Sequence, residues 1–503
     1  MRRRDLIKAA GSLYLMRSPG VESATSGSNP GEGEGLGLGE RSDTQSAVEA
    51  VRQSLRLIAE YDNIPRAIAW LNPQAIDDAV RIDSSAGSGT LAGIRLLAKS
   101  TFDIAGTPTD GSNETWARLF TAPASTDSVS VARVRNAGAL ILGKGAADDF
   151  GYGGSGLATA TGQVFNPRYP NRQRISGGSS GGGAAAVAAG YCDAAFGTDD
   201  GGSNRIPAHY CGIVGVKTTF GLVPRTGVIP SWPWFDCHGP LAANARIAAQ
   251  VLAEMAGPDP SDALARRLRG AATQSPFSST LENKRLGLVT SHVRLDSLPS
   301  KQAAAFRRAI GQMKAAGATV VPVDPPITMD NLAARLKAPG ASPYDIPACA
   351  NALVRYLDRR PGGAERWLPL VMPAYQGYYS YLPSSPEEVL AMSETPYEQS
   401  EKGQAYADQR DALVDELARF CSTQNLDAMI WPTLNHLALK VDEPWPDGDT
   451  PLSFANLLGL PDISVPVVAQ RADEPLGNVS FVGLPFTDFE LLALAHAFEE
   501  IRE

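Results

Sequence analysis

The spacing of apolar residues along the chain predicts helices that alternate with short buried strands. Four apolar residues recur at helical spacing near residue 50: Val48, Val51, Leu55 and Ile58. Residues 93–98 read as a strand that ends on Lys99. Two later segments each place a helical pattern before a glycine and an apolar strand: 129–136 before Gly138 and 139–142, and 303–316 before Gly317 and 318–321. A closing apolar helix is expected around 491–498.

This alternation favours an α/β protein with a largely parallel sheet. No linker divides the chain beyond residue 45, and no repeat of the solenoid kind is present. Residues 259–425 are richer in Pro, Tyr and charge and contain no chemical motif. We therefore predict one large α/β domain over residues 45–503. Its core is a twisted mixed β-sheet covered by α-helices on both faces, with the functional site at the strand ends.

The first 44 residues follow a different pattern. Arg3 and Arg4 precede Leu6, Ile7 and Lys8 in the manner of a twin-arginine signal, and an apolar run follows over 9–16. A Gly- and Ser-rich stretch then continues to residue 44. That order is typical of an export signal and a disordered linker, so a periplasmic location is expected. The short apolar run leaves a cytoplasmic location as the alternative.

Composition narrows the range of partners. The chain has 503 residues, of which 43% are hydrophobic and 20% charged, and its net charge is −9. A negative charge without a basic stripe argues against nucleic acid and anionic membranes as partners. Past the first 44 residues, no stretch is long and apolar enough for stable membrane insertion. The five cysteines and five histidines are scattered. Neither a metal site nor a disulfide framework is therefore expected.

The candidate chemistry lies in two glycine-rich segments. The first, SGGSSGGG over 176–183, leads directly into an apolar helical run over 184–189. Such a chain lets backbone N–H groups approach a ligand at a helix start, although it lacks the order of a P-loop. The second, GTDDGGSNRIPA over 197–208, places two glycines before Ser203. Consecutive N–H groups there can form the anion-binding nest that an oxyanion hole requires. On composition alone, a plain turn remains the commoner interpretation.

The two segments in this order, followed by GIVGVK over 212–217, resemble the amidase signature family. Upstream, LAGIRLLAK over 91–99 is similar to the strand that carries the family's catalytic lysine. The similarity extends from about residue 45 to 500 and thins between 259 and 425. It implies hydrolysis of a linear carboxamide to a carboxylic acid and ammonia or an amine, through an acyl-enzyme and without metal or organic cofactor.

The resemblance also implies a role for each motif residue. Ser203 would be the nucleophile, Ser179 the proton bridge that follows a cis peptide bond, and Lys99 the base. The backbone N–H groups of the oxyanion hole would belong to Asp200, Gly201, Gly202 and Ser203. A lysine acts as a base only when neutral, and burial among apolar residues such as those before Lys99 promotes that state.

The chain departs from the family pattern at four places, five residues in all: Ser100, Gly145-Ala146, Ser176 and Thr218. Ser100 stands where aspartate is usual, so we expect different support for Lys99. The expected partner is a small-molecule amide, and a homodimer is left open. Three alternatives also remain open: an amidotransferase A subunit of the glutamyl-tRNA type, an esterase, and a catalytically silent scaffold.

Overall fold

The computed structural model describes residues 46–502, apart from 86–88, 170, 268–279, 294–295, 338–339, 379–381, 384, 447–450 and 470–473. The twin-arginine pattern and the linker predicted over residues 1–44 lie outside the described residues. Export therefore stays a prediction.

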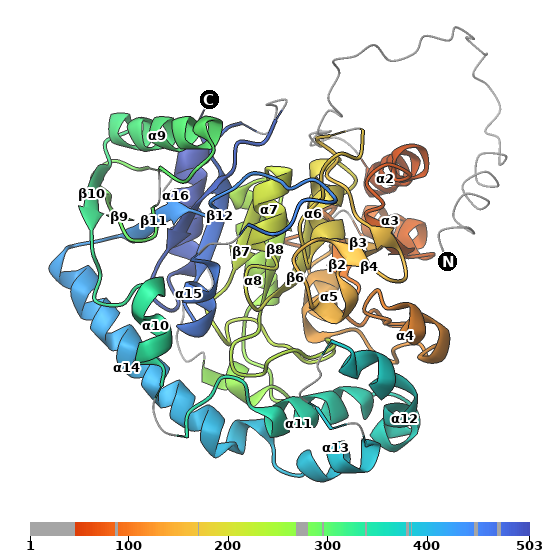
Figure 1. Ribbon diagram of the computed structural model, residues 1–503. Helices are drawn as coiled ribbons and strands as arrows, with labels where there is room; N and C mark the ends of the chain where they lie inside the picture. Colours follow the sequence, from red (N-terminus) through yellow and green to blue (C-terminus); the bar gives the residue numbers. More distant parts are fainter. Residues whose placement is uncertain are drawn as a thin grey trace, which may run out of the picture.

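A mixed sheet of 11 strands runs through the described chain (Figure 1). Its strand order is β1-β3-β2-β6-β8-β7-β12-β13-β11-β9-β10. The strands are β1 (Ile68–Leu71), β2 (Arg95–Lys99), β3 (Leu140–Gly145), β6 (Ala194–Asp199), β7 (Val214–Lys217), β8 (Cys237–Ala242), β9 (Arg285–Val289), β10 (Thr319–Val323), β11 (Ala428–Pro432), β12 (Asp462–Pro466) and β13 (Asn478–Val482). A separate hairpin pairs β4 (Leu157–Ala158) with β5 (Gly162–Gln163). The predicted single domain with a mixed sheet is confirmed.

The strand directions correct the expectation of a largely parallel sheet. Strand β2 is parallel to β3 and β6, and β9 is parallel to β10 and β11. The central strands are antiparallel: β8 pairs antiparallel with both β6 and β7, and β12 pairs antiparallel with β13. The helix-to-strand pattern identified the two parallel parts, and the antiparallel centre has no such pattern.

Fifteen α-helices of the described chain surround the sheet. They are α2 (Ala47–Tyr61), α3 (Ala75–Ser84), α4 (Glu114–Leu119), α5 (Val129–Asn136), α6 (Gly181–Ala188), α7 (Arg205–Cys211), α8 (Ala245–Met255), α9 (Ser300–Ala315), α10 (Met329–Arg335), α11 (Ile346–Leu357), α12 (Gly363–Gln376), α13 (Pro386–Met392), α14 (Glu401–Thr423), α15 (Leu452–Leu457) and α16 (Asp488–Glu499). The helices predicted from periodicity correspond to α2, α5, α9 and α16. Gly138 and Gly317, which follow two of them, both have φ of 91°.

Alternate residues of β2 face two separate hydrophobic cores, which confirms helices on both faces. Leu96 and Ala98 belong to a core shared with α5, α8, α9 and α16. Leu97 belongs to a core shared with α2, α3, α6 and α7. This alternation is the two-residue period of a strand that is buried on both sides.

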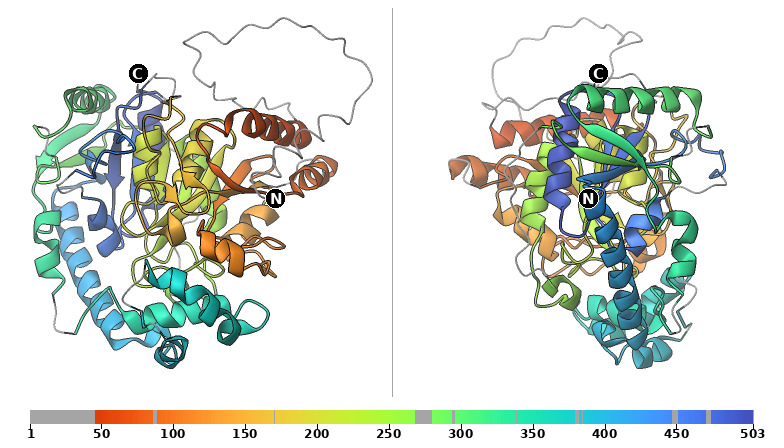
Figure 2. Two further views of the ribbon diagram at one scale, coloured as in Figure 1. Left: turned by 45° about the vertical axis from the view of Figure 1, so that its right-hand side comes forward. Right: turned by 90° about the vertical axis from the view of Figure 1, so that its left-hand side faces the viewer.

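Within the region without motifs, 259–425, the described residues form mainly helices, together with β9 and β10. Helices α11, α12 and α13 gather at one end of the molecule, and the long α14 leads from there back toward β11 (Figures 1 and 2). Among the described helices, none combines the length and apolar character that crossing a membrane requires.

Candidate active site

Lys99 and Thr198 meet because they end two neighbouring parallel strands. Strands β2 and β6 are parallel partners, so their carboxyl ends share one edge of the sheet. Lys99 is the last residue of β2, and Thr198 is the next-to-last residue of β6. The Lys99 ammonium donates hydrogen bonds to Thr198 Oγ1 and to Ser179 Oγ, both at 2.7 Å. The expected site at the strand ends is therefore where two of the three candidate side chains meet.

The surroundings of Lys99 favour the neutral amine. Lys99 is 2% exposed. Burial lowers the pKa of Lys99 from 10.5 to about 8, because the charged form loses its hydration. The negative charges of Asp200, Asp236 and other nearby carboxylates oppose this shift. The resulting pKa leaves a large fraction of the amine unprotonated in mildly alkaline solution.

Ser179 lies in the loop that opens α6, and the peptide bond between Gly178 and Ser179 is cis, as the resemblance implies. Asp148 holds this loop from the other side. Its backbone N–H donates to the Ser179 carbonyl at 3.2 Å, and a Cβ at Gly178 would collide with its carboxylate. Gly151 packs against the Lys99 and Ser179 side chains, since a Cβ there would lie 3.3 Å from Lys99 Nζ and 3.7 Å from Ser179 Oγ.

Ser203 lies in the turn between β6 and α7, next to the Ser179 loop. The backbone N–H of Ser180 donates to the Ser203 carbonyl at 3.1 Å, which joins the two glycine-rich segments. Ser203 is 6% exposed. Among the described residues, no group forms a hydrogen bond with its hydroxyl, so the contact with Ser179 is not made here. Catalytic hydrogen bonds are often loose without substrate and tighten when it binds.

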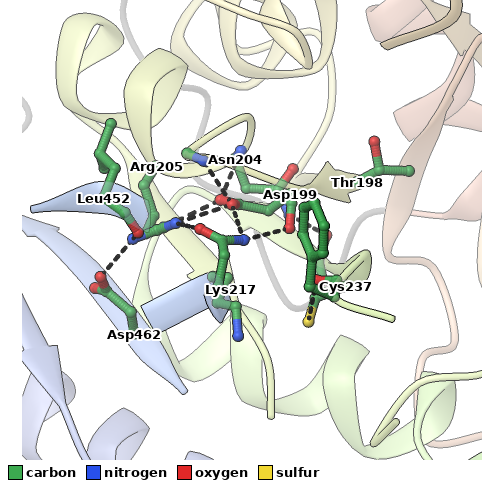
Figure 3. Close-up of polar contacts among 12 residues, drawn as sticks. Thr198, Asp199, Asn204, Arg205, Lys217, Cys237, Leu452 and Asp462 are labelled. Atoms are coloured by element: carbon green, nitrogen blue, oxygen red, sulfur yellow. Dashed lines mark hydrogen bonds and ion pairs between the residues drawn. The ribbon is translucent and has the colours of Figure 1, made fainter. Parts of the chain in front are cut away.

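A buried ion-pair network fixes the turn that carries Ser203 (Figure 3). Arg205 binds Asp199 through two nitrogens, at 2.9 and 3.1 Å, and binds Asp462 of β12 at 2.7 Å. It also donates to the side chain of Asn456 at 2.6 Å. Burial alone would raise the pKa of Asp199, but the charge and hydrogen bonds of Arg205 outweigh it and hold that pKa below its ordinary value. Asp199 therefore stays ionised.

The ionised Asp199 accepts backbone donors from the turn itself. Its two oxygens accept from the N–H of Gly202 at 2.7 Å and from the N–H of Asn204 at 3.1 Å. Of the four N–H groups that the resemblance places in an oxyanion hole, that of Gly202 is thus engaged with a carboxylate. The structure shows no hydrogen bond from the N–H groups of Asp200, Gly201 and Ser203 to any described residue.

The departures from the family pattern have local explanations. The Ser100 hydroxyl accepts from Ser112 at 2.8 Å. Gly145 permits close packing of β3 on α6, because a Cβ there would lie 2.8 Å from the backbone nitrogen of Gly183. Thr218 donates to the His238 carbonyl at 2.8 Å, and Ser176 donates to the Gly177 carbonyl at 2.8 Å. None of the four departures replaces Lys99, Ser179 or Ser203.

Sequence reasoning assigned no role to several residues that shape the site. Thr198, Asp199 and Arg205 lie within the second glycine-rich segment, 197–208. That segment was therefore the one sequence signal that could have pointed to them. Asp148 and Gly151 lie in an ordinary-looking segment, and no sequence pattern singles them out. The described residues contain no group of three or more His, Cys, Asp or Glu side chains that could hold a metal ion.

Comparison with known proteins places this geometry in a family. The family model described as Amidase matches residues 49–492. The chain belongs to the amidase family. The A subunit of glutamyl-tRNA(Gln) amidotransferase from Symbiobacterium thermophilum is 31% identical over 91% of this chain and 93% of its own length.

Two solved structures extend the comparison. The native peptide amidase of Stenotrophomonas maltophilia matches with a TM-score of 0.73 and 27% identity, over 91% of this chain and 93% of that one. The A subunit of glutamyl-tRNA(Gln) amidotransferase from Thermotoga maritima matches with a TM-score of 0.66 and 25% identity, over 91% and 92%. This member of the amidase family is an amidohydrolase that acts on amide C–N bonds. The alternative of a catalytically silent scaffold is therefore dropped.

Proposed function

We propose that the protein hydrolyses a linear carboxamide to a carboxylic acid and ammonia or an amine, through an acyl-enzyme on Ser203. The observation that supports this most is the buried Lys99 amine 2.7 Å from the Ser179 hydroxyl, beside the turn that carries Ser203. A serine hydroxyl is a weak nucleophile until a base takes its proton. Lys99 and Ser179 would supply that base.

Each step conserves protons and electron pairs. Ser203 Oγ attacks the amide carbonyl while its proton passes to Ser179 Oγ, whose own proton passes to the neutral Lys99 amine. The tetrahedral intermediate places its negative oxygen near the N–H groups of the turn. Its collapse breaks the C–N bond, and the proton returns through Ser179 to the departing nitrogen. Water then attacks the acyl-enzyme by the same relay, which releases the acid and restores Ser203.

Two other activities remain candidates. The relatives that are A subunits of glutamyl-tRNA(Gln) amidotransferase favour a glutaminase whose ammonia passes to a partner protein. Co-purification of such a partner, with glutaminase activity that depends on it, would support this alternative. An esterase would use the same acyl-enzyme, and comparing amide with ester turnover would identify it.

The test is release of ammonia or amine across aliphatic, aromatic and peptide amides and glutamine, with Ser203→Ala as the blank. We expect turnover of at least one class of amide by the natural chain and none by the variant. Accumulation of an acyl group on Ser203, detected by mass spectrometry after rapid quenching, would identify the nucleophile. Equal turnover by both proteins would contradict the proposed role of Ser203.

A further inference from the structure

A cavity of about 420 Å³ lies beside the candidate active site. Its wall includes residues 225–231, Asp236 and His238. Two backbone hydrogen bonds tie this wall to the residues that follow Lys99: Ile229 N–H donates to the Thr101 carbonyl, and Asp103 N–H donates to the Gly227 carbonyl, both at 2.9 Å. His238 of β8 also pairs directly with Thr198 of β6. The cavity is therefore built onto the strands that carry the Lys99 site.

The end of the cavity nearest this site contains polar atoms without partners. Asp236 is 3% exposed and His238 is fully buried, and they contact each other at 3.3 Å through Oδ2 and Nε2. Their other polar atoms, Asp236 Oδ1 and His238 Nδ1, form no hydrogen bond with any residue that the structure describes. A buried polar atom without a partner is costly, which points to a ligand group that completes it.

Asp200, which does not itself line the cavity, adds a second carboxyl group behind this end of the wall. Its Oδ1 is also buried, without a hydrogen bond to the described part of the chain, and a hydrogen bond from Ser231 of the cavity wall reaches its carboxyl group. Burial and the negative charge of Asp236 raise the pKa of Asp200 well above its ordinary value. Asp200 and Asp236 are the neighbours of the paired residues Asp199 and Cys237, so their carboxyl groups lie close enough to repel each other, which a bound cation would relieve.

The positive groups of the wall are already paired. Arg225 binds Asp262 at 2.9 Å, and Arg355 binds Glu398 at 3.1 Å. Arg359 donates to Thr126 and lies 3.8 Å from Asp103. Arg225 also acts on Asp236 at longer range. None of these described ion pairs uses the carboxyl group of Asp236 or of Asp200.

We propose that Asp200 and Asp236 form a subsite that binds the ammonium group of a cationic amide substrate while its carbonyl lies at Ser203. An ammonium group has three N–H donors and no acceptor, which suits two carboxyl groups with unused oxygens. In the motif pattern GTDxGGS, Asp200 occupies the variable position. This subsite would therefore set specificity without changing the reaction. The inference rests on the proposed amidase function.

The first test compares amides that carry an ammonium group with uncharged alkyl amides of the same length. We expect kcat/KM of the natural chain to be about 10- to 100-fold higher for the cationic member of a pair, as a charge-assisted hydrogen bond would give. Asp236→Asn should remove most of that preference while turnover of the neutral amide persists. Glu474→Gln removes the same charge from a surface pair with Lys301 and should leave the preference intact. An unchanged preference in Asp236→Asn would overturn the proposal.

A binding measurement separates failure of the subsite from failure of the proposed function. Hexylamine and hexanol are titrated into Ser203→Ala and into Ser203→Ala with Asp236→Asn, followed by ligand-observed NMR. Tighter binding of hexylamine that Asp236→Asn abolishes supports the subsite even if no amide is hydrolysed. Equal binding of amine and alcohol overturns it even if amides are hydrolysed. If Asp236→Asn does not fold, by its thermal melting curve, Asp200→Asn takes its place.

Discussion

At the scale of single residues, the state of Lys99 decides how the proposed relay depends on pH. The relay needs a neutral amine, and burial lowers the pKa of Lys99 to about 8. Below that pH the amine is protonated, so kcat/KM should fall about tenfold per pH unit toward acid, and it should level off above it. The measurement is kcat/KM for one amide between pH 6 and pH 10. A midpoint near the ordinary lysine value of 10.5 would contradict a buried base.

Thr198 offers a second prediction, because it positions Lys99 without being part of the relay. Thr198→Val keeps the shape of the side chain but removes the acceptor of one Lys99 hydrogen bond. We expect kcat/KM to fall about 5- to 10-fold, as loss of one such bond would give. The midpoint of the pH profile should also move lower, because the charged amine loses an acceptor. Thr198→Ser keeps the hydroxyl and should restore both values; a midpoint unchanged by Thr198→Val would refute this role.

At the scale of elements, Arg205 joins α7 to β6 and β12. Arg205→Met leaves the buried carboxylates of Asp199 and Asp462 without their counter-charge. Such a loss costs about 3–5 kcal/mol of folding free energy. Urea denaturation should show it as a lower midpoint. Arg335→Met breaks a surface pair with Glu416 and should cost about 1 kcal/mol or less. Similar losses in both variants would show that the buried network does not hold the turn.

The same elements show what the sequence could predict. Helix α5 and strand β2 carry strong apolar periods between clear ends, and their positions were predicted within two residues. The order of the central strands was not predictable, because pairing of β8 between β6 and β7 depends on contacts between distant segments. Periodicity reports which face of a strand is buried and does not report its neighbour.

The candidate site likewise combines features that the sequence could predict with features that it could not. The resemblance pointed to Lys99, Ser179 and Ser203, and the structure brings Lys99 and Ser179 into contact. The packing of Asp148 and Gly151 around Lys99 and Ser179 was not predicted, because an aspartate and a glycine in a loop have no distinctive spacing. The engagement of the Gly202 N–H with Asp199 was also missed, since a motif names residues and not the direction of their N–H groups.

At the scale of the whole molecule, the region without motifs closes the structure around the cavity wall. The first turns of α14 pack on Trp234, which is 1% exposed and lies between two residues of that wall, Pro233 and Asp236. Gly403 of α14 lies so close to the Trp234 indole that an added Cβ would overlap it. The absence of a side chain at this one position therefore lets a helix from the variable region support the cavity beside the candidate site.

Gly403→Ala sets two effects against each other. Alanine in place of glycine inside a helix favours folding by about 1 kcal/mol. Overpacking against a rigid buried ring costs about 1–3 kcal/mol, and here the ring cannot move without displacing the cavity wall. We expect the clash to win, with a lower melting temperature. Displacement of the wall should also raise KM for amides more than it lowers kcat. Gly311→Ala in α9 is the matched control, because its added Cβ meets nothing within 4 Å. That variant should gain stability and keep its KM. A gain of stability in both variants would mean that α14 does not bear on the cavity wall.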